Sequence, residues 1–163
     1  MFEEIIKKCL LKVRRECSFF GSMMLYAQIE TTKKLPTAAT DGRKIFFVSG
    51  NTPTSDREAI RGIVEKQKNS ITVASLGTFS TGINIRNLHN IVFASPSKSQ
   101  IRVLQSIGRG LRKTDDNKDT TLYDIVDDIS WKSRKNYGIL HGDERLRIYG
   151  REKFTHKTYK VQL

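Results

Sequence analysis

Short apolar runs alternate with amphipathic stretches along most of the chain. Continuous runs rich in β-branched and aromatic residues occupy 22–29, 44–49, 71–75, 90–95 and 120–126. Between them, apolar residues recur at helical spacing over 54–69 and 97–113. Strands that are apolar on both faces and alternate with helices are typical of a parallel sheet covered on both sides. The pattern therefore predicts an α/β fold.

The same periodicity predicts which side chains face the core. A helix over 3–16 has one apolar face, and a further helix is expected around 143–154. Thr54 or Ser55 is the expected cap of the helix that follows Pro53. The expected inward residues are Ile60, Ile63 and Val64 in the first central helix, Ile101, Leu104 and Ile107 to Leu111 in the second, and Leu146, Ile148 and Tyr149 in the last.

The net positive charge of the chain suggests a polyanionic binding partner. The 163 residues include 29 basic and 17 acidic side chains, a net charge of +12 with an isoelectric point near 9.9. Such a balance favours a polyanion, most simply nucleic acid. Two cysteines, Cys9 and Cys17, and three scattered histidines provide neither a disulfide framework nor metal-ligand spacing. No apolar run reaches the length of a membrane span, and the charged start is unlike a signal peptide.

The last part of the chain is basic and contains aromatic residues. Residues 132–160 hold nine Lys or Arg against three acids, interleaved with Trp131, Tyr137, Tyr149, Phe154 and Tyr159. Basic and aromatic side chains together suit backbone neutralisation with base stacking. The competing interpretation is a terminal helix whose aromatic residues pack inward and whose lysines are solvated.

Four residues in the second central helix form a polar face. Gln105, Gly108, Arg109 and Arg112 stand at i, i+3, i+4 and i+7, so a helix places them on one side. Two guanidinium groups one turn apart can bind phosphate oxygens. A surface salt-bridge pair is the alternative that this spacing leaves open.

A turn of small residues follows the run at 71–75. Ser80-Thr81-Gly82 would allow backbone N–H groups to approach a phosphate closely. On these three residues alone, a tight turn between strands is the favoured interpretation.

Together these two segments resemble motifs V and VI of superfamily-2 helicases. The segment from Thr78 to Asn84, TFSTGIN, resembles motif V, and QSIGRGLR, which starts at Gln105, has the motif VI form Q-x-x-G-R-x-x-R. The resemblance is to the carboxy-terminal RecA-like domain, within the UvsW-like group of phage recombination and repair helicases. It covers roughly 44–163 and is strong over 71–112. It departs over 1–43, where Pro36 interrupts the helix that the family has after its first strand.

The resemblance implies three segments and a set of functional residues. The segments are a poorly matched start (1–43), a RecA-like core (44–128) and a basic carboxy-terminal extension (129–163). Arg109 and Arg112 would be arginine fingers, and Gln105 would orient or sense the nucleotide. Nucleotide contacts would also involve Gly82 and Gly108. Contacts to the nucleic-acid backbone would come from Gly50, Thr52, Ser80, Thr81 and Asn84.

ATP and Mg²⁺ would bind only together with a missing first RecA-like domain. The sequence contains no G-x-x-x-x-G-K-[ST] segment and no D-E-x-[HD] segment, and no metal ligands are expected within this chain. The expectation is therefore half of an ATPase, a truncated, split or separately expressed domain.

The expected function is the second motor domain of an ATP-dependent helicase. Such an enzyme would act in recombination, repair or replication-fork remodelling, on branched or forked DNA or on an RNA–DNA hybrid. It would be cytoplasmic, in the host cell if a phage encodes it. Two alternatives stay open: a non-catalytic nucleic-acid-binding module, and a regulatory partner of another helicase.

Overall fold

The computed structural model describes residues 22–26, 43–67, 69–75, 85, 88–94, 97–110, 120–130, 132 and 136–160. For 22–26, 109 and 110 it describes the backbone alone. The expected helix over 3–16 and the segment around Pro36 lie outside these residues. Within the described parts, no helix is long and apolar enough to cross a membrane.

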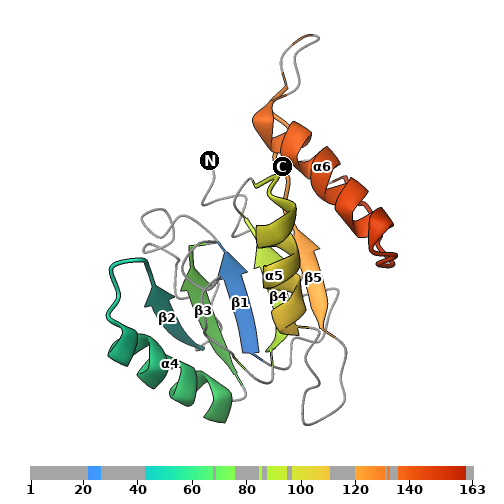
Figure 1. Cartoon of the computed structure of the whole chain (residues 1–163). Helices are drawn as coiled ribbons and strands as arrows, with labels where there is room; N and C mark the ends of the chain where they lie inside the picture. The colour runs from blue at the N-terminus through green and yellow to red at the C-terminus, as the bar shows by residue number, and fades with distance from the viewer. Residues whose placement is uncertain are drawn as a thin grey trace.

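Five parallel strands form a single sheet (Figure 1). In space their order is β2-β3-β1-β4-β5. The strands are β1 (Ser22–Tyr26), β2 (Lys44–Val48), β3 (Ser70–Ala74), β4 (Leu88–Phe93) and β5 (Thr121–Asp124). Every apolar run predicted as a strand is a strand, with ends shifted by one to three residues at most. β1 occupies the centre, between β3 and β4.

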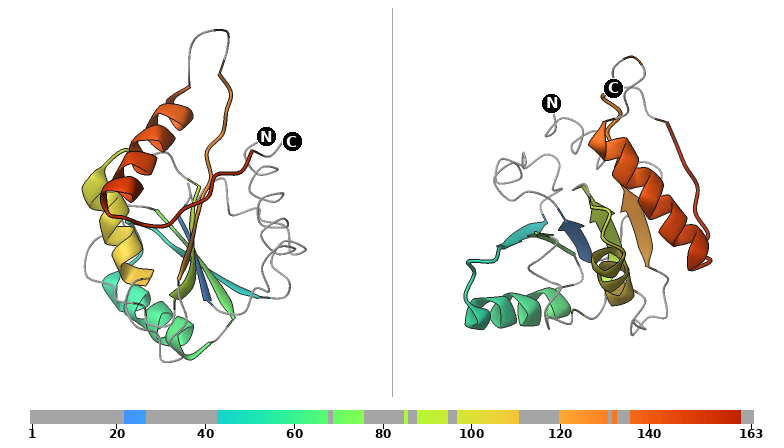
Figure 2. Two further views of the ribbon diagram at one scale, coloured as in Figure 1. Left: turned by 90° about the vertical axis from the view of Figure 1, so that its right-hand side faces the viewer. Right: turned by 45° about the horizontal axis from the view of Figure 1, so that its top comes forward.

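Three described helices cover one face of this sheet (Figure 2, left). They are α4 (Thr54–Lys66), α5 (Gln100–Gly110) and α6 (Tyr137–Arg151). α4 connects β2 to β3, and α5 lies between β4 and β5 in the chain. A helix that links two neighbouring parallel strands must run back along the sheet, so α4 and α5 begin near the carboxyl ends of the strands.

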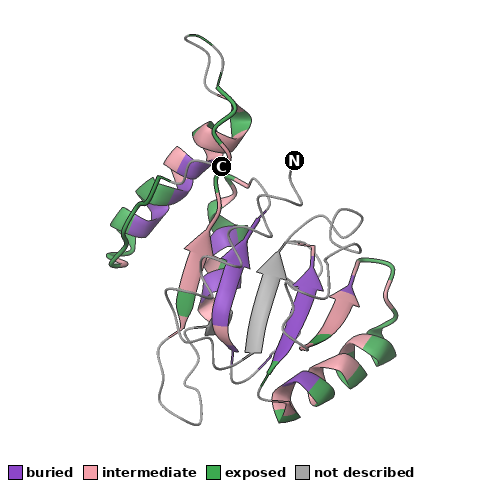
Figure 3. Cartoon of the chain, turned by 180° about the vertical axis from the view of Figure 1, so that it is seen from behind, coloured by how far each residue is buried: buried purple, intermediate pink, exposed green. Residues whose placement is uncertain are grey.

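Alternation along the strands produces two apolar layers. Figure 3 shows that β3 and almost all of β4 are buried. Ile91 and Phe93 of β4 face the helices and join the larger cluster, which includes Val103 and Ile107 of α5 and Ile148 of α6. Neighbouring side chains, such as Val92 of β4 and Val73 of β3, form a smaller cluster on the other face. Side chains point to opposite faces in successive positions of a strand, which explains why continuous apolar runs serve both layers.

Several details of the predicted helices are wrong. Ile101 is 70% exposed, Ile63 41% and Leu146 37%, so these three are not core residues. Each lies on a helix flank that no neighbouring element covers in the described structure. The residue that precedes α4 is Pro53, and neither Thr54 nor Ser55 caps it, because α4 has no side-chain cap hydrogen bond. Val64, Ile148 and Tyr149 are buried as predicted.

α6 starts six residues before its predicted start at 143. Asn136 is its N-cap, accepting a hydrogen bond from the Ile139 amide at 3.4 Å. The Asn136 side chain also donates to the Asp127 carbonyl at 2.9 Å, which ties the helix start to the segment after β5. Gly142 packs against Val126 so closely that an added Cβ would lie 2.8 Å from Val126 Cγ2. The absence of a side chain at Gly142 therefore sets the distance between α6 and the chain that leaves β5.

We expect Gly142→Ala to destabilise the fold by about 1–3 kcal/mol through this clash, typical of overpacking. Gly150→Ala is the matched control in the same helix, because an added Cβ there would meet no atom within 4 Å. Its expected effect is neutral or stabilising by up to about 1 kcal/mol, from helix propensity. Urea unfolding followed by circular dichroism measures both, and equal stability of the two variants would contradict the assigned packing.

Candidate functional site

The predicted site residues that the structure describes lie toward opposite ends of the sheet. The turn with Gly50 and Thr52 follows the carboxyl end of β2. α5 runs antiparallel to the strands (Figure 1), so Gly108 and Arg109 lie near its far end, toward the amino ends of the strands. At about 1.5 Å per residue, α5 separates its two ends by roughly 16 Å. Gly50 and Thr52, the nucleic-acid candidates that the structure describes, therefore lie apart from the nucleotide candidates Gly108 and Arg109.

The turn after β2 is held by side chains as well as by backbone. The Ser49 amide donates to Thr52 Oγ1 at 2.9 Å, and the Thr52 amide donates to the Ser49 carbonyl at 3.1 Å. Arg57 of α4 donates from Nε to the Thr52 carbonyl at 2.7 Å and from Nη2 to the Gly50 carbonyl at 2.8 Å. The Thr52 hydroxyl oxygen therefore helps to close the turn, while Gly50 stays exposed.

Arg57 was not anticipated by the sequence reasoning. Its signal is its place in the first turns of a helix directly after a Gly-Asn-Thr-Pro turn, where a long cation can reach back to free carbonyls. Both carbonyls accept a hydrogen bond from Arg57, which links the turn to the first turns of α4.

The polar face of α5 is present where the structure describes it. Gln105 is exposed and Gly108 is half-buried. Val103 (0% exposed), Ser106 (4%) and Ile107 (7%) form the opposite, buried face. Arg109 lies in α5, but its side chain is outside the described atoms. Arg112 and the motif V candidates Ser80, Thr81, Gly82 and Asn84 lie outside the described residues, so their roles stay predictions.

No close contact within the described structure requires residue 108 to be a glycine. An added Cβ there would meet no atom within 4 Å, in contrast to Gly142. A glycine in a helix interior costs up to about 1 kcal/mol relative to alanine. The surface beside Gly108 is therefore open to a group from outside this domain.

A buried polar cluster joins α6, β5 and the connection that precedes α5. Arg145 is only 2% exposed, and it donates from Nε and Nη2 to the two carboxylate oxygens of Asp124 at 2.7 and 2.8 Å. Its Nη1 donates to the Ser97 carbonyl at 2.9 Å. The Tyr149 hydroxyl donates to Asp124 Oδ2 at 2.9 Å. Two parallel guanidinium–carboxylate bonds are among the stronger and more directional polar contacts in proteins.

Burial, together with the neighbouring Asp124 carboxylate, raises the pKa of the Tyr149 phenol well above its usual value near 10. Tyr149 therefore remains a protonated hydrogen-bond donor at all physiological pH values. Arg145 and Tyr149 satisfy both oxygens of Asp124, which offsets part of the cost of burying the carboxylate.

Two of the aromatic residues considered for base stacking are unavailable. Tyr149 is 4% exposed, and Phe154 packs partly buried against the larger apolar cluster. Tyr137 and Tyr159 are 78% and 69% exposed. Trp131 lies outside the described residues. Among the described residues, no group of three or more His, Cys, Asp or Glu side chains is arranged to hold a metal ion.

Comparison with known families decides how this fold is classified. The model of the helicase conserved C-terminal domain matches residues 4–114. The chain belongs to this family. The match spans both motif segments and includes residues before 44. The predicted RecA-like α/β fold is confirmed, with a parallel sheet flanked by helices.

The predicted resemblance to UvsW is also confirmed. The chain is 38% identical over 130 residues to the ATP-dependent DNA helicase UvsW of Enterobacteria phage T4, covering 74% of this chain. It superposes on the crystal structure of T4 UvsW with a TM-score of 0.64 over 93% of its length, at 31% identity. The chain spans only 26% of the curated UvsW sequence and 32% of the UvsW chain in that structure.

Two further relatives share parts of this similarity. The putative ATP-dependent helicase IRC3 of Saccharomyces cerevisiae is 29% identical over 114 residues, which are 67% of this chain and 16% of IRC3. Domain 2 of the DEAD-box helicase Mss116p, solved bound to an RNA duplex, gives a TM-score of 0.59 over 78% of this chain and 53% of that one. At 15% identity, the latter shows a shared fold alone.

We expect Arg145→Ala to destabilise the helicase domain by about 3–5 kcal/mol, because it leaves the largely buried carboxylate of Asp124 without its charged partner. Arg147→Ala is the matched control on the same helix, since Arg147 is exposed and pairs only with exposed Glu144. Its expected cost is under about 1 kcal/mol. Chemical denaturation of both variants tests this, and an Arg145 variant as stable as the Arg147 variant would contradict the role of the cluster.

Proposed function

We propose that this chain is the second motor domain of an ATP-dependent nucleic-acid helicase of the UvsW type. The family membership and the similarity to UvsW support a helicase role. The single structural observation that carries the nucleotide part is the polar face of α5. Gln105 is exposed there, Gly108 borders open space, and Arg109 follows directly in the same helix.

In this proposal, ATP and Mg²⁺ bind on a first RecA-like domain that faces the polar side of α5. Arg109 and Arg112 then neutralise the charge that develops on the transferring γ-phosphoryl group, a contribution of about 10³–10⁵ in turnover in related enzymes. Gln105 orients or senses the nucleotide, and the missing side chain of Gly108 lets the triphosphate or the other domain approach. In this proposal the chain does not need to supply the phosphate-binding loop. This agrees with the absence of a G-x-x-x-x-G-K-[ST] (Walker A) segment from its sequence.

The nucleic-acid contacts are proposed at the other end of the domain. The exposed Gly50 and its turn follow β2, and the motif V residues Ser80, Thr81 and Asn84 follow β3 in the chain. Ligands of open parallel sheets bind beyond the carboxyl ends of the strands, which supports a strand of nucleic acid there. The substrate proposed is forked or branched DNA, as part of recombination or repair.

A reconstitution experiment tests the nucleotide role. The chain is mixed with the first RecA-like domain of T4 UvsW, and ATP hydrolysis is measured with and without forked DNA. We expect no turnover by the chain alone and DNA-stimulated turnover by the mixture. Arg109→Ala and Arg112→Ala should each lower that turnover at least 10³-fold, with most DNA binding retained.

Arg102→Ala is the control for this experiment. Arg102 is exposed on α5 two turns before Arg109. Its replacement by alanine therefore removes the same charge from the same side of the helix. It should leave turnover within about twofold of the unchanged mixture, since it lies outside the proposed motif. Turnover by the chain alone would reveal a complete ATP site and overturn the bipartite proposal. Equal losses of turnover and DNA binding in the arginine variants would overturn their role as fingers.

Gly108→Ala separates a structural role from a functional one. We expect it to stabilise the fold by up to about 1 kcal/mol, because alanine is the better helix former and space is available. The same substitution should lower ATP turnover of the mixture, because the added methyl group lies on the face that meets the nucleotide. Thermal unfolding and turnover are measured on one preparation. Unchanged turnover would mean that nothing approaches Gly108 closely.

A further inference from the structure

The end of α6 and the segment after it form a cationic surface. Residues 147–160 contain five lysines and arginines and a single carboxylate, Glu152, and all six of these side chains are exposed. We call the five cations the C-terminal basic strip: Arg147, Arg151, Lys153, Lys157 and Lys160. The strip contains no residue of motif V or motif VI and lies apart from the turn after β2.

Three members of the strip are free to bind an anion. Within the described part of the chain, Lys153, Lys157 and Lys160 form no ion pair with a carboxylate. Arg147 pairs with Glu144, and Arg151 donates to Gln100 Oε1 at 3.4 Å. Tyr159 stands between Lys157 and Lys160 in the sequence and is 69% exposed. An exposed aromatic ring between unpaired cations combines a stacking surface with phosphate neutralisation.

Lys153 is held in a backbone conformation that favours glycine. Its φ is 58°, and of the non-glycine residues in the described structure, only Lys153 and Lys132 have a positive φ. The Lys153 amide donates to the Gly150 carbonyl at 3.2 Å, and the Phe154 amide donates to the Tyr149 carbonyl at 2.9 Å. These two hydrogen bonds form a Schellman motif with Lys153 at the left-handed position, where glycine is preferred. A lysine at this position lowers the stability of the fold relative to glycine, and the fold alone does not require a lysine there.

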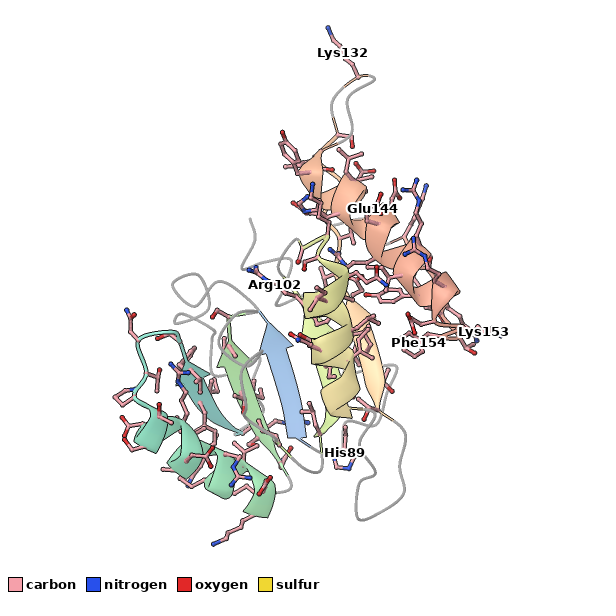
Figure 4. The ribbon with its side chains drawn as sticks, viewed as in Figure 1. His89, Arg102, Lys132, Glu144, Lys153 and Phe154 are labelled. Carbon is pink, nitrogen blue, oxygen red and sulfur yellow. The ribbon has the colours of Figure 1, made fainter. Side chains whose placement is uncertain are left out.

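The strip begins on α6, which contacts with β5 and with the larger apolar cluster hold in place. Arg145 and Tyr149 attach α6 to Asp124, and Phe154 packs against the apolar cluster directly after Lys153. Figure 4 shows Lys153 and Phe154 together at the end of α6. From there the segment 155–160 crosses beside β5 toward the other face of the sheet (Figure 2, left). α6 and its C-terminal turn therefore position Arg147, Arg151 and Lys153, and the segment that carries the other two lysines runs beside β5.

We propose that the C-terminal basic strip binds the sugar-phosphate backbone of a nucleic-acid strand, with Tyr159 as a stacking surface for a base. This inference rests on the proposed nucleic-acid partner, and it adds a second contact region beside β5, at the opposite edge of the sheet from β2 and the turn that follows it. The strip would hold a part of the nucleic-acid strand that the turn after β2 does not reach.

The test uses the full 163-residue chain and a fluorescent single-stranded DNA oligonucleotide. Affinity is measured by anisotropy between 0.05 and 0.5 M salt, a range of roughly tenfold chosen to resolve the slope of log K against log salt. Replacing Lys153, Lys157 and Lys160 together by alanine removes three phosphate contacts. The slope should fall by about 2, and the affinity near 0.1 M salt should fall about 100-fold. A matched control replaces Lys44, Lys66 and Arg102 by alanine, three exposed cations outside the strip.

Lys153→Gly provides a readout that a structural role would not produce. Because glycine accepts the left-handed conformation, this variant should unfold at a temperature higher by roughly 2–4 °C. It should nevertheless bind the oligonucleotide more weakly, by about fivefold, the factor expected when one contact is lost near 0.1 M salt. Lys153→Arg should retain the affinity. A variant that is both more stable and weaker in binding locates the function in the lysine side chain.

The outcomes separate the inference from the proposed function. If the unchanged chain binds with salt-dependent affinity and the strip variant behaves like the control, the inference is overturned while the motor proposal stands. If the strip variant loses affinity and the control does not, the inference is supported. If the unchanged chain binds neither DNA nor RNA of the same sequence, both the strip and the nucleic-acid part of the proposed function are wrong.

Discussion

The bidentate pair between Arg145 and Asp124 determines how the carboxy-terminal third of the domain is assembled. Asp124 is the last residue of β5, and its side chain lies on the face of the sheet that the helices cover. A carboxylate at that place requires a cation, and Arg145 provides it from α6. The third bond of Arg145, to the Ser97 carbonyl, reaches the segment from which α5 begins. One side chain thus connects β5, α6 and the approach to the helix that carries motif VI.

This connection joins the elements that carry the two proposed contact regions. α5 is positioned by Val103 and Ile107 beneath its polar face, and its amino end is held near α6 through Ser97. The proposed nucleotide contacts lie at the carboxyl end of α5. The turn held by Arg57 lies at the opposite end of the domain, beyond the carboxyl ends of the strands. If the domain binds nucleic acid at one end of the strands and completes an ATP site at the other, the two sites can move together without internal rearrangement. Closure against a first domain would then move both surfaces together.

The sequence predicted the sheet well because its signals are local. Runs such as 44–49 and 90–95 are apolar on both faces, and a parallel sheet covered by helices is the arrangement that buries them. The stripe of Gln105 and Gly108 opposite Val103 and Ile107 was likewise readable from helical spacing. The predicted burial of Ile101, Ile63 and Leu146 failed because periodicity identifies a face, but it does not tell how far a neighbouring element extends over that face.

The buried cluster could not be predicted in this way. Arg145 stands among solvated cations, and nothing in its neighbourhood distinguishes it from Arg147 two residues later. Its role depends on Asp124, which is 21 residues away and whose orientation follows from the register of β4 with β5. The same applies to Tyr149, which the sequence presents as one more aromatic residue in a basic region. Long-range pairing of charged groups is a property of the fold, and only the spatial arrangement reveals it.

The short strand β5 has a further consequence for how copies of this domain behave in solution. Among the described strands it pairs with β4 alone, which places it at an edge of the sheet. Exposed edges of this kind promote aggregation unless charged side chains or covering segments block them. The segment after α6 runs beside this edge and carries lysines along it. A segment that attracts polyanions would therefore also keep identical sheets from joining edge to edge.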